Sequence, residues 1–99
     1  MIVECSPDGD VRLLEPSEFR RFKVALKGQR DDRSLTFKGI TFVDDNNALV
    51  AVDLVPTLPG RPADASWDAG YADMVRKAAE HGWIDSQANA IRAHIENSD

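Results

Sequence analysis

The chain has little of what many small proteins use for stability. Its 99 residues include one cysteine, Cys5, so neither an internal disulfide nor a cysteine-rich zinc site can form. The longest uninterrupted apolar run, Ala48–Val52, is far shorter than the roughly 20 residues that a membrane-spanning helix requires. The N-terminus lacks the basic and apolar regions of a signal peptide, so we expect a cytoplasmic protein with no membrane partner.

Several motifs that bind nucleotides, metal ions or acyl groups are also absent. The sequence contains no P-loop, no Gly-x-Gly-x-x-Gly, no Gly-x-Ser-x-Gly and no His-Glu-x-x-His. The acidic stretch over residues 44–47 lacks the spacing and the glycine of an EF-hand loop. We therefore expect no cofactor and no metal ion. The net charge of −5 argues against nucleic acid as the main partner.

The composition that remains is that of one small globular domain. Apolar residues make up 42% of the chain and charged residues 29%, with no repeat and no low-complexity segment. The length fits a single domain over residues 1–99. A core of this size leaves little room for an internal cofactor cavity, so we expect any ligand site to be a surface groove or a subunit interface.

The hydrophobic pattern predicts two β-hairpins. The apolar runs Ile2–Cys5 and Val11–Glu15 flank a segment rich in Pro, Asp and Gly, residues that favour a tight turn. A second hairpin is predicted from Leu35–Val43 and Ala48–Val55, joined by an Asp- and Asn-rich turn. The Ala48–Val55 strand is apolar on both faces, which is typical of a strand at the centre of a sheet.

Two helices and a last strand complete the prediction. The first helix is expected over residues 17–27, followed by a charged loop over residues 29–34. Its apolar residues recur at the spacing of one helix face: Phe19, Phe22 and Leu26. The second helix is expected over Ser66–His81, ended by Gly82, with Trp83 folded back onto its last turn. Ala90–Glu96 alternates between apolar and polar residues, as a half-buried strand does.

The order of these elements is ββαββαβ, or βαββαβ if the first two strands act as one. The second order is ferredoxin-like, so we expect a two-layer α+β sandwich. Its mainly antiparallel sheet would have four to five strands, with both helices on one face. The other face of the Leu35–Val55 hairpin would then need a cover, and another copy of the chain is the simplest one. We therefore expect a homodimer.

The last predicted strand carries the candidate catalytic residues. Arg92, His94 and Glu96 occupy every second position, so they would project from one face of the strand. A histidine beside a carboxylate can act as a general base, and an arginine can hold an anionic substrate. Alternating charged residues are also common on an exposed strand that performs no chemistry.

A second candidate site is a basic segment. Residues 19–38 contain seven Lys and Arg residues against two Asp residues, although the whole chain is acidic. On the predicted helix, Arg20, Lys23 and Lys27 would form one flank that binds an anion or an acidic partner. Acidic residues elsewhere in the chain could instead neutralise this flank. No aromatic residue interleaves the exposed positions, so a stacking surface for single-stranded nucleic acid is missing.

Aromatic residues around the second predicted helix are the third candidate. Trp67, Tyr71 and Trp83 could line a pocket between this helix and the sheet, although rings at helical spacing are more often core residues. His81 lies in the last turn of the helix, where a cation suits the helix dipole. Cys5 lies in an apolar run, so we expect it to be a small buried side chain.

Three functions fit these features. The first is a small, homodimeric, non-catalytic module that binds a protein or a small anionic molecule. The second is a cofactor-free enzyme in which His94 is the acid or base and Arg92 orients an anionic substrate. The third is an acidic inhibitor or immunity-type protein that binds a basic partner. Its contact residues would be Asp64, Asp68, Asp73 and Asp85.

Overall fold

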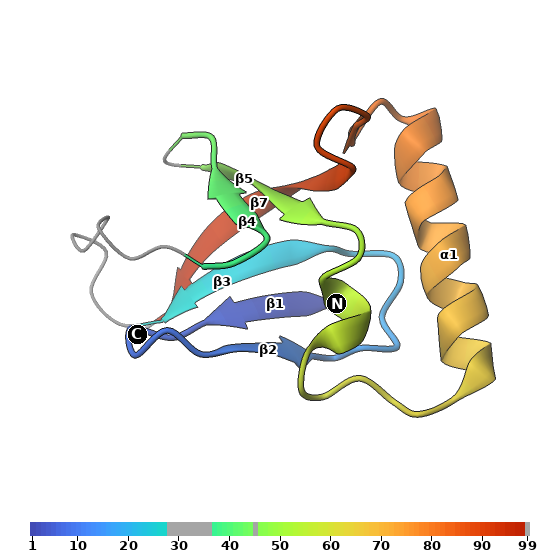
Figure 1. Ribbon diagram of the computed structural model, residues 1–99, viewed down its shortest axis with the longest axis horizontal. Coiled ribbons are helices and arrows are strands. Elements are labelled where there is room, and N and C mark those ends of the chain that lie inside the picture. Colours follow the sequence, from blue (N-terminus) through green and yellow to red (C-terminus); the bar gives the residue numbers. More distant parts are fainter. Residues whose placement is uncertain (28–36, 45, 99) are drawn as a thin grey trace.

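The computed structural model describes residues 1–27, 37–44 and 46–98, which form one curled sheet and one α-helix (Figure 1). The elements in chain order are β1 (Ile2–Cys5), β2 (Val11–Leu14), β3 (Lys23–Lys27), β4 (Ile40–Phe42), β5 (Asn47–Ala51), the 3₁₀ helix η1 (Val55–Thr57), α1 (Ala65–Glu80), β6 (Ile84–Asp85) and β7 (Ala90–Ser98). The loop predicted over residues 29–34 and the first two residues of the predicted Leu35–Val43 strand lie outside the described residues.

The strands form a mixed sheet in the order β2-β1-β3-β7-β5-β4. β3 runs parallel to both β1 and β7, whereas the β1–β2, β5–β7 and β4–β5 pairs are antiparallel. β5 pairs with residues 90–94 along one edge of β7. On the opposite edge, residues 94–98 pair with β3 and residues 90–91 pair with β6. β3 and β6 therefore follow one another along the same edge of β7.

The core lies inside the curl of the sheet, and α1 covers one end of it. The inward residues of β1, β3, β5 and β7 are at most 5% exposed: Val3, Cys5, Val24, Ala48, Val50, Ile91, Ala93 and Ile95. α1 crosses one end of the strands (Figure 1) and buries Trp67, Tyr71, Met74 and Ala78. Because burial of one large apolar side chain is worth about 1.5–3 kcal/mol, these contacts hold α1 on the sheet.

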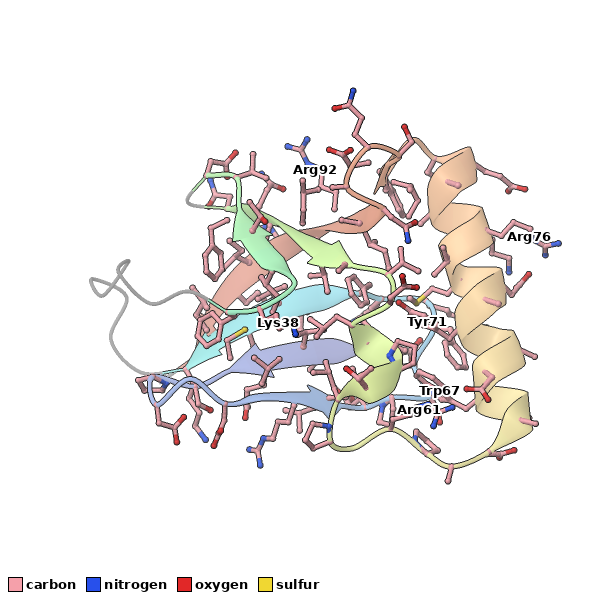
Figure 2. The ribbon with its side chains drawn as sticks, in the orientation of Figure 1. Lys38, Arg61, Trp67, Tyr71, Arg76 and Arg92 are labelled. Carbon is pink, nitrogen blue, oxygen red and sulfur yellow. The ribbon has the colours of Figure 1, made fainter. Side chains whose placement is uncertain are left out.

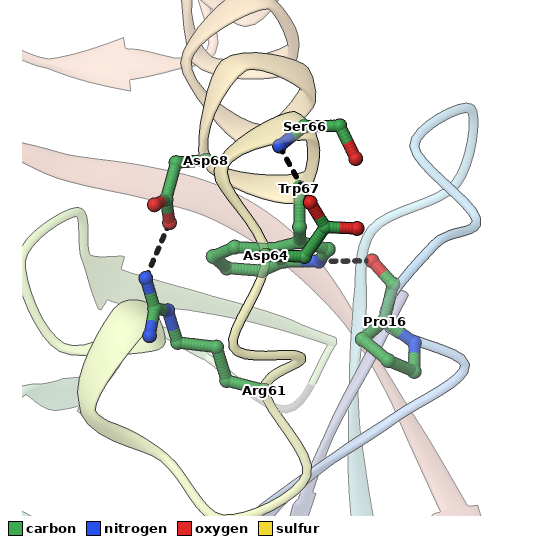
Figure 3. Close-up of polar contacts among 6 residues, drawn as sticks. All are labelled: Pro16, Arg61, Asp64, Ser66, Trp67 and Asp68. Atoms are coloured by element: carbon green, nitrogen blue, oxygen red, sulfur yellow. Dashed lines mark hydrogen bonds and ion pairs between the residues drawn. The ribbon is translucent and has the colours of Figure 1, made fainter.

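Local signals define both ends of α1, and the one at the C-terminus was predicted from the sequence. The Asp64 carboxylate caps the N-terminus by accepting a 2.9 Å hydrogen bond from the Ser66 N–H (Figure 3). At the C-terminus Gly82 has φ +77°, and the Trp83 N–H donates to the Ala78 carbonyl at 2.9 Å. This is the predicted Schellman motif, in which glycine adopts the left-handed conformation that most residues avoid.

The predicted ferredoxin-like sandwich is wrong, because the first predicted helix does not form. Residues 17–22 form turns and irregular backbone, and residues 23–27 form β3. In β3, Val24 is fully buried and Ala25 is 8% exposed, with strands on both sides. Pairing along both edges of β3 provides partners for its backbone hydrogen-bonding groups, and the sheet buries residues on both faces of the strand. These contributions favour the strand over a helix whose only signal was the spacing of three apolar residues.

The second predicted hairpin forms, but its last strand is shorter and less central than expected. β5 ends at Ala51, and it lies between β7 and the edge strand β4. β3 and β7 occupy the centre instead. The outer face of the sheet carries ion pairs that join Arg12 to Glu4 at 2.6 Å and Lys23 to Glu96 at 2.7 Å. The N-terminal hairpin is confirmed, and the last strand is confirmed with an extension to Ser98.

Candidate ligand-binding groove

A groove of about 730 Å³ lies beside β7, near the place where β3 begins and the pairing of β7 with β6 stops. This volume is within the range of small-molecule sites. Four parts of the chain line the groove: the segment before β3, the start of β5, the second half of α1 with the residues that follow it, and the middle of β7. These parts lie far apart in the sequence and meet only in the fold.

The β7 residues of the groove include two candidates from the sequence. Arg92 and His94 are exposed, whereas Ile91 and Ala93 between them are buried. Figure 2 shows the Arg92 side chain projecting from the sheet into solvent. In the register of the sheet, His94 lies between Lys23 of β3 and the first residue of β5.

Trp83 lies at the end of the groove nearest the C-terminus of α1. Its carbonyl accepts a 2.7 Å hydrogen bond from the Arg92 N–H, so its main chain is tied to β7 as well as to α1. Its ring stacks on the His81 ring, with centroids 4.6 Å apart and planes inclined by 23°. The residue is nevertheless 53% exposed, which is unusual for a tryptophan.

The segment before β3 supplies Phe19, Arg20 and Phe22 to the groove. The Met1 ammonium group donates hydrogen bonds of 2.6 Å to the carbonyls of Glu18 and Arg21, which fixes the ends of this segment. The Phe19 ring packs at a tilted angle on the Trp67 ring, with centroids 6.3 Å apart. The segment is therefore anchored by main-chain hydrogen bonds and by an aromatic contact with α1.

The charge of the groove is positive, although the chain is acidic overall. Its fully charged lining residues are Arg20, Lys77, Arg92 and Asp73. The Lys77 Nζ lies 3.3 Å from an Asp73 carboxylate oxygen, and Arg76 contacts the same carboxylate. The hydrogen bond from Lys77 contributes most to lowering the pKa of Asp73. Lys77 therefore already has a carboxylate partner, which it shares with Arg76.

Unlike Lys77, the two arginines of the groove have no close carboxylate partner among the described residues. Among the described residues, no carboxylate oxygen lies within 4 Å of the guanidinium of Arg20 or Arg92. Arg92 acts on Asp44 at longer range: the pKa of Asp44 is lowered mainly by a hydrogen bond from the Asn46 N–H, and the charge of Arg92 adds to this effect. Both arginines are available to an anion, which they can bind through paired N–H donors.

The structure separates the other sequence candidates from this groove. Glu96 is bound by Lys23 at 2.7 Å, and this hydrogen bond lowers the pKa of Glu96. Neither Glu96 nor Lys23 lines the groove, and neither does Lys27, at the end of β3. The helical flank expected from Arg20, Lys23 and Lys27 does not form, because Lys23 and Lys27 lie on the strand β3 and Arg20 precedes it. Binding of an anion or a partner by Lys23 and Lys27 stays a prediction.

Trp67 and Tyr71 lie in the core between α1 and the sheet (Figure 2), and neither is among the residues that line the groove. Their rings stack in parallel at 5.2 Å. The Trp67 Nε1–H donates to the Pro16 carbonyl at 2.7 Å (Figure 3), and the Tyr71 hydroxyl donates to the Val52 carbonyl at 2.8 Å. Burial raises the pKa of Tyr71. Both polar groups are satisfied internally, as a structural role requires.

Cys5 is not placed to act as a nucleophile. It is 1% exposed, and burial, followed by the nearby Glu4, raises its pKa to about 12. Within the described ranges, no three His, Cys, Asp or Glu residues are grouped so that they could hold a metal ion. No helix in the described part of the chain is long and apolar enough to cross a membrane.

Sequence reasoning missed Phe19, Phe22, Asn47 and Lys77 as groove residues. No signal in the sequence could have found them, because they belong to different elements and point to the groove only after β3 pairs with β7. Comparison of the chain with protein-family models, with curated proteins and with solved structures gave no match. The function is therefore inferred from the groove itself.

Proposed function

We propose that this protein is a small non-catalytic binding module whose groove takes a small anionic molecule. The observation that supports this proposal is the placement of Arg20 and Arg92 in one concave site of about 730 Å³, with no carboxylate within 4 Å among the described residues. An anion in the groove can accept hydrogen bonds from these arginines. The concave shape and the size favour a small molecule over the broad, flatter surface that a protein partner needs.

The enzyme alternative has less support. A general base needs a partner that orients it, and Glu96 was the candidate for that role. Glu96 is already bound by Lys23 at 2.7 Å, so its carboxylate has a cationic partner other than His94. His94 still lines the groove, where it can contribute a hydrogen bond or a positive charge to an anion. The catalytic role of Arg92, His94 and Glu96 stays a prediction.

The inhibitor alternative depends on four acidic residues, and each of them already has an internal partner. Asp64 caps α1, Asp68 pairs with Arg61, and Asp73 pairs with Lys77. Asp85, at the end of β6, accepts hydrogen bonds from two backbone N–H groups that follow it. A basic partner would have to compete with these contacts, so this alternative ranks below the first.

The homodimer and the cytoplasmic location stay predictions. The apolar area available to a second copy is smaller than the sequence suggested, because much of the outer sheet face is charged. Its apolar part comprises the half-buried residues Leu49 and Ala51 on β5, together with Val43, which is 50% exposed. Light scattering across a range of protein concentrations would measure the oligomeric state.

Titration with small anions tests the proposed function. Inorganic phosphate, citrate and 2-naphthoate are added to the labelled protein, and backbone NMR shifts report where each anion binds. We expect at least one of these anions to shift residues of the groove and to bind about tenfold more weakly to Arg92→Ala, since hydrogen bonds to charged groups are worth about 1.5–3 kcal/mol. Arg20→Ala should also weaken binding.

Arg21→Ala is the matched control for both variants. Arg21 is adjacent to Arg20 and is exposed, but it does not line the groove, and its main-chain carbonyl is kept in the variant. We expect it to bind the anions as the parent protein does. Equal affinity for the parent, Arg20→Ala and Arg92→Ala would contradict the proposal.

A further inference from the structure

Trp83 is the most exposed large apolar side chain in the described part of the chain, yet its position is tightly defined. Its N–H donates to the Ala78 carbonyl at 2.9 Å, and its carbonyl accepts from the Arg92 N–H at 2.7 Å. Its ring stacks on His81, with centroids 4.6 Å apart. The residue is therefore held in place by its main chain and by one ring contact, while more than half of its surface remains accessible.

An exposed ring fixed in this way is suited to stacking with a planar ligand. Holding the ring before the ligand arrives reduces the entropy that binding must otherwise lose. The rest of the groove includes Phe19, Phe22 and Met74, which provide apolar surface for the edges of such a ligand. Aromatic rings in offset or edge contacts gain affinity beyond that from the area they bury.

The charged part of the groove begins next to this ring. Arg92 follows Ile91 on β7, which pairs with Ile84, the residue after Trp83. The hydrogen bond between the two main chains therefore places the Arg92 side chain on the strand directly beside the residue that carries the indole. The planar guanidinium can bind a carboxylate or a phosphate through two parallel hydrogen bonds.

We propose that the ligand of this groove is a planar aromatic anion, whose ring stacks on Trp83 while Arg92 holds its carboxylate or phosphate group. This inference rests on the proposed function and adds the aromatic requirement to it. An aliphatic anion of the same size and charge would gain the contact with Arg92 but would lose the stacking with Trp83. The groove should therefore discriminate between two anions that differ only in aromaticity.

Calorimetry with matched probes tests this requirement. The probes are 2-naphthoate, 2-naphthyl phosphate and decahydro-2-naphthoate, which is the saturated analogue of the first. We expect 2-naphthoate to bind about fivefold or more tightly than its saturated analogue, the range expected for an aromatic contact. 2-Naphthyl phosphate differs from 2-naphthoate in its anionic group, so comparing the two aromatic anions tests that group. The stronger of the two identifies the anionic group that Arg92 prefers. The indole N–H resonance of Trp83 should shift on binding.

Two variants locate the effect. Trp83→Leu keeps an apolar side chain and the main-chain hydrogen bonds, so we expect it to fold and to lose the preference for the aromatic anions. Val43→Ala is the control, because Val43 is also a large exposed apolar residue and does not line the groove. If Trp83→Leu does not fold, the comparison of the three probes on the parent protein decides the question.

The outcomes separate this inference from the proposed function. Equal affinity for aromatic and saturated anions, with the Arg92→Ala loss retained, would overturn the aromatic requirement and leave the anion-binding function standing. Aromatic preference that persists in Trp83→Leu would also overturn it. If none of the three probes binds, and phosphate and citrate do not bind either, both proposals fail.

Discussion

The Phe19 ring lies so close to Gly70 of α1 that a β-carbon on Gly70 would be 2.5 Å from the Phe19 Cε2. Phe19 lines the groove, whereas Gly70 lies on the helix behind it. The small residue in α1 thus allows the segment before β3 to approach the helix. This contact joins the packing of the core to the shape of the groove.

Gly70→Ala should show coupling to Phe19. Alanine favours a helix over glycine by about 1 kcal/mol, but its methyl group must displace the Phe19 ring. We expect Gly70→Ala to be stabilising in the Phe19→Ala background and neutral or destabilising in the parent, with a coupling of about 1 kcal/mol or more in urea unfolding. Additive effects of the two substitutions would show that the ring moves freely.

Gly60 and Gly9 offer a matched pair for measuring a steric effect. Their φ values are +98° and +95°, so alanine suffers similar backbone strain at both positions. A β-carbon on Gly60 would lie 2.2 Å from the Leu13 carbonyl oxygen, whereas nothing lies within 4 Å at Gly9. We expect Gly60→Ala to lower the free energy of unfolding by about 2 kcal/mol more than Gly9→Ala. Equal losses would mean that the Gly60 backbone moves away from β2.

Cys5 should resist thiol reagents until the protein unfolds. Its thiol is 1% exposed, and its pKa is raised from 9.0 to about 12, so little thiolate forms at pH 8. We expect no reaction with a disulfide reagent in buffer and a full reaction of one thiol in urea. Rapid labelling of the folded protein would place Cys5 at the surface.

The same thiol predicts a pH dependence of stability. Because the native pKa lies above the unfolded value, the native state keeps the proton, and stability falls as pH rises through about 9. The slope from this group is at most about 1.4 kcal/mol per pH unit. Cys5→Ala removes this contribution, so between pH 8.5 and 9.5 its stability should fall less steeply than that of the parent.

Substitutions on β7 separate the groove from the rest of the outer sheet face. Glu96→Gln should leave the affinity for a groove anion within about twofold of the parent value, because Glu96 pairs with Lys23 and does not line the groove. His94→Ala should weaken the same anion, because His94 lines the groove. The measurement is calorimetry at fixed pH and salt. A larger loss of anion affinity in Glu96→Gln than in His94→Ala would show that Glu96 belongs to the binding site.

Several elements could be predicted because their signals are local. The turn after β1 and the Schellman motif at Gly82 each depend on a few adjacent residues whose conformational preferences are strong. The alternation of β7 is equally plain, and it placed Arg92 and His94 on one exposed face.

Residues 17–27 were assigned wrongly because their local signals were ambiguous. Phe19, Phe22 and Leu26 fit a helix face, and Val24 to Leu26 also fit a short buried strand. The strand conformation is favoured because β1 and β7 form backbone hydrogen bonds with the two edges of β3. β7 lies about 70 residues from β3 in the chain, so the local sequence pattern of residues 17–27 does not indicate this pairing.

The sequence by itself therefore determined the turns, the C-terminal end of α1 and the outward face of β7, since these depend on neighbours within a few residues. Only the tertiary structure decided that β3 is a strand, that β3 and β6 share one edge of β7, and that a groove forms between them. It also brought Arg20, Trp83 and Arg92 together. Pairing and packing between distant segments produced this site, because the free energy that favours it comes from contacts no single segment can make.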